Sequence, residues 1–132
     1  MNWYKIAKNK NEELITVINS LPKVNEGDYV NGLKVRKDIP NLSSISASLG
    51  SDYRDFGVRE VPMEWFSQTK ESPELASEIN VNKEINPLIV VVDGHKNGLA
   101  YILEGSHRMD ALNTLEIKTF PALVLLDEKD IV

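Results

Sequence analysis

The run Leu88-Ile89-Val90-Val91-Val92 constrains the fold of this chain more than any other segment. All of its residues are apolar and most are β-branched, which favours a strand. An apolar strand without a polar alternation is typical of a sheet that is covered on both faces. We therefore expect a buried strand at 88–92. The segment Leu99–Leu103 follows two turn dipeptides, Asp93-Gly94 and Asn97-Gly98, and is expected to return as its partner.

Apolar spacing predicts helices on either side of this pair. Leu14 begins a set of apolar residues at intervals of three and four, which predicts a helix near residues 11–20. Ser72 and Pro73 are typical of a helix start, so a second helix is expected from there. A third helix is expected directly after Gly105. Its shared face consists of Arg108, Ala111, Leu112 and Leu115.

Three further segments are expected to be extended. Residues 58–63 predict a short strand, and Pro62 restricts it to an edge or a strand end. Residues 120–126 predict a final apolar strand, and Asn31-Gly32 is typical of a small hairpin. We therefore expect one α+β domain over residues 1–132, with a mixed sheet and helices packed on it.

The segment Ser43–Leu49 is rich in hydroxyl groups and has two interpretations. Ile45 and Leu49 are four residues apart, which fits one helical turn. The serines fit equally well a loop that contacts a ligand. Both interpretations stay open at this point.

Composition narrows the possible functions. The chain has 132 residues, no cysteine and a formal net charge of −5. Without cysteine there are no disulfides, thiolate metal sites or cysteine nucleophiles. The acidic balance disfavours non-specific nucleic-acid binding, which depends on clustered Lys and Arg. No segment has the pattern of a signal peptide or the length of a membrane span, so we expect a cytoplasmic protein without a membrane partner.

The segment Glu104-Gly105-Ser106-His107-Arg108 lies between the second strand of the pair and the third helix. A strand that turns at glycine into a helix leaves the first N–H groups of that helix unpaired, beside the positive end of its dipole. Such a turn binds anions, and an imidazole and a guanidinium in the first turn suit a phosphate. The same residues also fit a structural turn, with Ser106 as N-cap and Arg108 paired with a surface carboxylate.

Three segments follow one another in a distinctive order and spacing: Ile85–Val90, Tyr101–Leu112 and Phe120–Val124. Together they resemble the ParB/sulfiredoxin superfamily, whose members combine an I-x-P-L-x-V strand, a Y-x-I-x-x-G-x-x-R turn, a helix with Ala and Leu, and an x-P-A-x-V strand. Glu60–Met63 resembles the opening strand of the superfamily. The resemblance covers about residues 57–126 and leaves residues 1–56 as an N-terminal extension of unknown role.

The resemblance implies a small α+β domain whose glycine turn holds the phosphates of a nucleotide such as ATP, ADP or CTP, together with magnesium. By position, Gly105 brings N–H groups to the phosphates, and His107 and Arg108 match the basic residues of the motif. Sulfiredoxins have Cys at the position of Ser106, so their thiolate chemistry is excluded. Partition proteins have Glu there and Arg at the position of His107, so this chain lacks the Glu that is associated with their metal-dependent nucleotide hydrolysis.

The turn is most similar to that of the free-serine kinases of the superfamily, which have an acid before the glycine and His before the arginine. There Glu104 is expected to position magnesium or a substrate hydroxyl, or else it is only a carboxylate at a strand end. Glu60 is a second candidate for a metal or a proton, or it pairs with Arg59 on the surface. The catalytic candidates are thus Glu104, His107 and Glu60.

Three functions follow as alternatives. The first is a magnesium-dependent nucleotide hydrolase or phosphotransferase with a small-molecule acceptor, and the second is a nucleotide-sensing or protein-interaction module without turnover. The third, a ParB-like DNA-binding protein or nuclease, is disfavoured by the acidic charge and by the lack of a helix-turn-helix segment after the core.

Overall fold

The computed structural model describes residues 11–49, 53–66, 70–92 and 100–127. In chain order the elements are α2 (Asn11–Ser20), β1 (Tyr29–Val30), β2 (Leu33–Val35), α3 (Leu42–Leu49), β3 (Tyr53–Pro62), the 3-10 helix η2 (Met63–Trp65), α4 (Pro73–Asn82), β4 (Glu84–Ile85), β5 (Leu88–Val92), β6 (Ala100–Glu104), α5 (Ser106–Thr114) and β7 (Thr119–Asp127). The strands form a three-stranded sheet of order β1-β2-β4 and a four-stranded sheet of order β3-β7-β5-β6. The predicted α+β class, with a mixed sheet and packed helices, is confirmed.

Strand β5 occupies an inner position of the four-stranded sheet, antiparallel to β6 and parallel to β7. All of its residues are buried, as the sequence predicted. Leu88, Val90 and Val92 belong to a large hydrophobic cluster, which we call the main core. Ile89 and Val91 belong to a smaller cluster, the second core. The run therefore has no polar residue, because its alternate side chains enter two separate cores.

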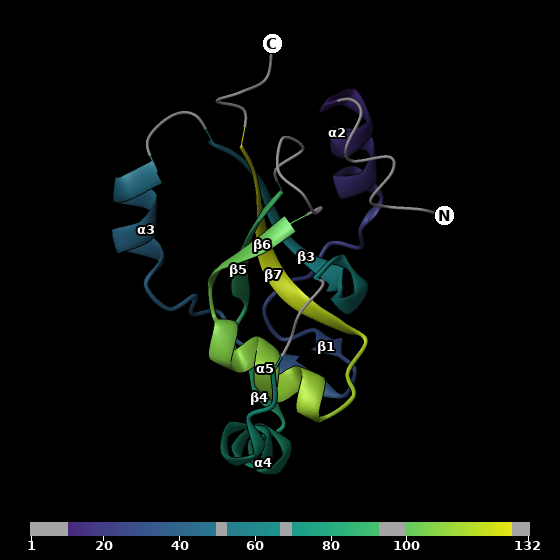
Figure 1. Cartoon of the computed structure of the whole chain (residues 1–132), viewed down its shortest axis with the longest axis vertical. Coiled ribbons are helices and arrows are strands. Elements are labelled where there is room, and N and C mark those ends of the chain that lie inside the picture. The colour runs from purple at the N-terminus through teal and green to yellow at the C-terminus, as the bar shows by residue number, and fades with distance from the viewer. Residues whose placement is uncertain (1–10, 50–52, 67–69, 93–99, 128–132) are drawn as a thin grey trace.

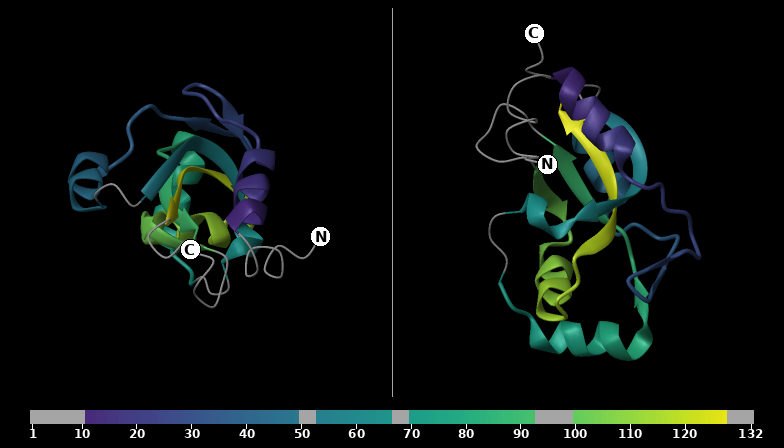
Figure 2. Two further views of the ribbon diagram at one scale, coloured as in Figure 1. Left: turned by 90° about the horizontal axis from the view of Figure 1, so that it is seen from above. Right: turned by 90° about the vertical axis from the view of Figure 1, so that its right-hand side faces the viewer.

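Different helices contribute to the two cores. Residues of α2, α4 and α5 belong to the main core. The second core instead includes Leu42 and Ile45 of α3. Figure 1 shows α3 at one side of the sheet and α4 and α5 below it. In Figure 2, α5 lies between α4 and the sheet.

The N-terminal part is largely as predicted. Helix α2 has the expected bounds. The hairpin β1–β2 turns at Asn31 (φ 50°) and Gly32 (φ 82°), the left-handed pair that a tight hairpin needs. Strand β2 also pairs in parallel with β4, a short strand that local sequence did not predict. The open question at Ser43–Leu49 is resolved in favour of a helix, α3.

Strand β3 is longer than the predicted strand at residues 58–63. It pairs with β7 at one edge of the sheet, with a bulge between Asp55 and Val58. Within the bulge Gly57 has φ 76°, and its N–H donates to Oδ1 of Asp55 at 2.7 Å. The pattern Asp-x-Gly is typical of a turn, but here it lies inside a strand. This explains why the predicted strand was shorter than β3. Pro62 ends β3, as expected.

Helix α4 begins at Pro73 and Ser72 is its N-cap residue, as predicted, but no side-chain cap forms. The Ser72 side chain makes no capping hydrogen bond, and its N–H donates to Oγ1 of Thr114 on α5 at 2.9 Å. Oδ1 of Asp110, also on α5, accepts from the N–H of Lys70 at 3.0 Å. Helix α5 therefore holds the backbone of Lys70 and Ser72, just before α4. Within the described ranges, every helix is too short or too polar to cross a membrane.

Candidate functional site

The predicted strand-to-helix turn at Gly105 is confirmed, because β6 ends at Glu104 and α5 begins at Ser106. Gly105 has φ 104°, a conformation that favours glycine. A Cβ atom at this position would lie 2.8 Å from Nη2 of Arg108 and 2.8 Å from Cγ of Leu88. Both the backbone conformation and the close packing therefore require glycine here.

The first turn of α5 presents N–H groups without helical acceptors. The N–H of Met109 donates to the carbonyl of Gly105 at 2.9 Å, so the N–H groups of Ser106, His107 and Arg108 precede the first helical bond. Gly105, not Ser106, is the N-cap, and no described side chain caps the helix. Ser106 and His107 are exposed. The turn thus offers the donors and the dipole end that an anion requires.

The Arg108 side chain points inward, away from the open surface that a simple phosphate contact requires. Only 15% of it is exposed. Its Nη1 donates to the carbonyl oxygens of Asn86 at 2.7 Å and Pro87 at 3.0 Å. The alternative interpretation, a surface ion pair, is met only in part. Nη2 of Arg108 lies 3.9 Å from Oε1 of Glu104, which is too far for a hydrogen bond. Arg108 therefore joins the turn to the loop between β4 and β5.

Burial changes the electrostatics of Arg108. Desolvation lowers the pKa of its guanidinium, and the nearby Glu104 carboxylate raises the pKa and so offsets part of that effect. Nη2 is buried and has no hydrogen-bond partner among the described residues. An arginine stays charged at neutral pH even so. The turn therefore keeps a positive charge close to Gly105.

The two candidate carboxylates lie apart. Glu104 ends β6, at one edge of the four-stranded sheet, and its side chain is 29% exposed. Glu60 lies on β3 at the opposite edge, three strand spacings away, which corresponds to about 14 Å. The expected surface pair of Glu60 with Arg59 does not describe Arg59 either. Arg59 is buried, and its guanidinium donates to the carbonyls of Phe56 and Leu21. Only Glu104 accompanies the Gly105–Arg108 turn.

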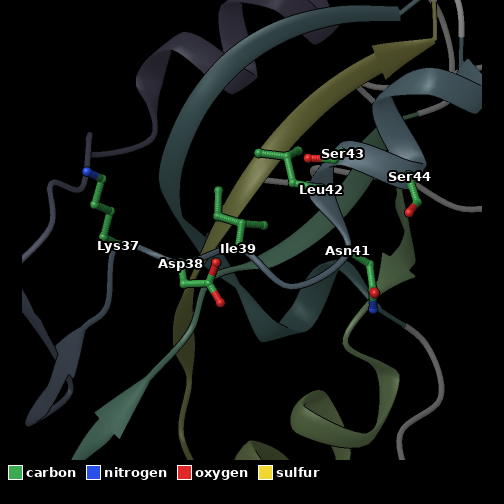
Figure 3. Close-up of a pocket in the computed structure, with 7 residues that line it drawn as sticks. All are labelled: Lys37, Asp38, Ile39, Asn41, Leu42, Ser43 and Ser44. Carbon is green, nitrogen blue, oxygen red and sulfur yellow. The ribbon is translucent and has the colours of Figure 1, made fainter.

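A pocket of about 570 Å³ opens along the segment 37–44, at the start of α3. Figure 3 shows the Asp38 carboxylate near the middle of the lining residues, Asn41 and Ser44 at one end, and the Lys37 ammonium pointing away at the other. Sequence reasoning considered the serines of this segment but not Asp38 or Asn41. No local pattern marks Asp38, because its place depends on contacts with distant residues.

Asn86 connects this pocket with the turn. Its Nδ2 donates to the carbonyl of Asp38 at 3.0 Å, while its own carbonyl accepts from Arg108. The second core adds a further connection, since it contains Leu42 of α3 and Leu103, the residue before Glu104. Figure 1 shows α5 beginning on the side of the molecule where α3 lies. Sequence reasoning did not single out Asn86 as a connecting residue.

The donor set for magnesium is small. Within the described ranges, no group of three or more His, Cys, Asp or Glu side chains is arranged to hold a metal ion. Magnesium in proteins often takes one or two carboxylates and completes its shell with substrate phosphates and water. Glu104 therefore fits this ion only together with a bound phosphate.

Comparisons with protein-family models, with curated proteins and with solved structures gave no match to this chain. The resemblance to the ParB/sulfiredoxin superfamily stays a prediction that rests on the motifs themselves.

Proposed function

We propose that this protein binds a nucleotide through phosphate contacts at the first turn of α5. The single observation that carries the proposal is the turn itself: N–H groups that precede the first helical bond, no side-chain cap among the described residues, and exposed neighbours at Ser106 and His107. Backbone N–H groups aligned with a helix dipole are a general way to hold phosphate. The motif resemblance supports a nucleotide over a free anion.

In this proposal the residues of the turn have different tasks. The N–H groups of the first turn and the Ser106 hydroxyl donate to phosphate oxygens, and the His107 imidazole lies beside them. Arg108 is a positioning residue, because its guanidinium holds the turn against the Asn86–Pro87 loop. Its buried positive charge also favours an anion at the turn.

A second candidate function is magnesium-dependent phosphoryl transfer. The observation that favours it is the partly exposed Glu104 carboxylate, which lies too far from Arg108 for a hydrogen bond. Glu104 is the residue that would hold magnesium together with the phosphates, and the ion would neutralise phosphate charge. The separation of Glu60 from the turn weighs against a role for it in the same step. Binding without turnover is therefore the better supported function.

A charge placed at Ser106 tests the proposal. In Ser106→Asp, a carboxylate in the first turn of α5 interacts favourably with the helix dipole, so the unliganded protein should be as stable as wild type or more so. The same carboxylate repels phosphate. Isothermal titration with tripolyphosphate, ATP, ADP, CTP and GTP, each with and without magnesium, should show binding to wild type and its loss in the variant.

Ser77→Asp is the matched control, because Ser77 is exposed on α4 and the change adds the same charge. It should bind as wild type does. The proposal is wrong if wild type binds none of these compounds, or if Ser106→Asp binds them as wild type does. Release of inorganic phosphate during the same titrations would favour the second candidate.

A further inference from the structure

The pocket along residues 37–44 has a lining that suits a polar organic ligand. It combines the Asp38 carboxylate, the Asn41 amide and the Ser44 hydroxyl with the apolar side chains of Ile39 and Leu42 (Figure 3). Its volume of about 570 Å³ lies within the usual range of small-molecule sites. The motif resemblance begins after this segment and says nothing about the pocket. The ligand of the pocket therefore has to be inferred from the side chains that line it.

The contacts around Asn86 link this pocket to the α5 turn. One hydrogen bond runs from Nδ2 of Asn86 to the carbonyl of Asp38, and another from Nη1 of Arg108 to the carbonyl of Asn86. Asp38, at the pocket, and Arg108, in the turn, thus contact the same residue of the β4–β5 loop. A ligand common to the pocket and the turn would extend past this residue.

We propose that this pocket binds the ribose and base of the nucleotide, and that the Asp38 carboxylate accepts hydrogen bonds from the ribose hydroxyl groups. The inference rests on the proposed function. An ionised carboxylate only accepts hydrogen bonds, and a ribose presents two neighbouring hydroxyl donors. The Asn41 amide both donates and accepts, which suits the edge of a base, and Ile39 and Leu42 provide apolar surface for its face.

Comparison of ribonucleotides with deoxyribonucleotides tests this assignment. The full chain is titrated with ATP, CTP, GTP, their 2′-deoxy counterparts and tripolyphosphate, in the presence of magnesium. A charge-assisted hydrogen bond predicts that at least one ribonucleotide binds about tenfold or more tightly than its deoxy form. Asp38→Asn should remove this preference and leave the affinity for tripolyphosphate unchanged.

Two further variants sharpen the test. Glu26→Gln removes the same charge at an exposed position before β1, outside the pocket lining, and should change no affinity. Asn41→Ala should weaken ribonucleotides and deoxyribonucleotides equally, because the amide contacts the base. Thermal melts of the unliganded variants verify that each is folded.

The outcomes separate this inference from the proposed function. If tripolyphosphate and nucleotides bind alike, or if Asp38→Asn keeps the ribose preference, the pocket does not bind the nucleoside, although the phosphate site stands. If neither tripolyphosphate nor any nucleotide binds to wild type, both the phosphate site and this inference are wrong.

Discussion

The guanidinium of Arg108 donates to two carbonyls on a loop more than twenty residues earlier in the chain. Arg108→Ala leaves these partly buried acceptors without the Arg108 donor and removes the side chain that covers Gly105. We expect the free energy of unfolding of the unliganded protein to fall by about 3 kcal/mol. Urea denaturation measures this change directly.

Arg36→Ala is the control for Arg108→Ala. Arg36 pairs with Glu84, but its side chain is 52% exposed, so its loss should cost less than about 1 kcal/mol. If the two substitutions cost the same, Arg108 does not hold the turn.

The sequence predicted the place of Arg108 in the first helical turn. It did not predict the inward direction, because Asn86 and Pro87 are distant in sequence.

Gly105 allows a second prediction at the residue scale. Gly105→Ala introduces a Cβ into a left-handed conformation and into contact with Arg108 and Leu88. We expect a loss of about 2 kcal/mol or more in the free energy of unfolding. Gly27→Ala imposes a similar conformation, φ 88°, with nothing within 4 Å of the new Cβ, and should cost about 1 kcal/mol. Equal losses in both variants would mean that close packing adds nothing at Gly105.

At the scale of elements, α3 depends on contacts outside itself. Its residues Leu42 and Ile45 pack in the second core, and the loop before it is held by Asn86. Asn86→Ala keeps the backbone carbonyl that Arg108 needs but removes the bond to Asp38. Hydrogen exchange at the Leu42 and Ile45 amides should become faster, with less than about 1 kcal/mol lost in global stability.

Asn82→Ala serves as the comparison for this variant, because Asn82 is exposed on α4. Its exchange rates in α3 should equal those of wild type. Unchanged exchange at Leu42 and Ile45 in Asn86→Ala would show that the second core alone holds α3.

The elements that sequence predicted well are those with local causes. Helical spacing predicted α2, Pro73 predicted the start of α4, and Asn31-Gly32 predicted the hairpin. Strand β4 was missed because two residues carry no periodic pattern and its partner β2 lies far away in sequence. Asp38 and Asn41 of the pocket were missed because the place of this segment depends on contacts with the distant Asn86 and with the second core.

At the scale of the whole molecule, residues on both sides of position 56 share one core. Val17 and Ile18 of α2 lie in the main core together with Leu88 and Phe120. Strand β3 crosses this position as well, because it runs from Tyr53 to Pro62. The part of the chain that the motif resemblance leaves out therefore contributes to the packing of the part that it covers.

This shared core predicts that a destabilising substitution in α2 also lowers the stability of strand β5. Val17 on α2 is 4% exposed and Val81 on α4 is 77% exposed, so the same Val→Ala change compares a core position with a surface position. Val17→Ala should lower the free energy of unfolding by about 2 kcal/mol, because it removes buried methyl groups and leaves a cavity. Val81→Ala should stay within about 0.5 kcal/mol of wild type.

Hydrogen exchange then distinguishes one cooperative unit from two. If α2 and the sheet unfold together, the protection of the β5 amides should fall in Val17→Ala by the same free energy that denaturation measures. If α2 unfolds separately, its own amides lose protection while those of β5 keep the wild-type rates. The second result would contradict a common core, and residues 11–20 would then be an appendage on a sheet that is stable without them.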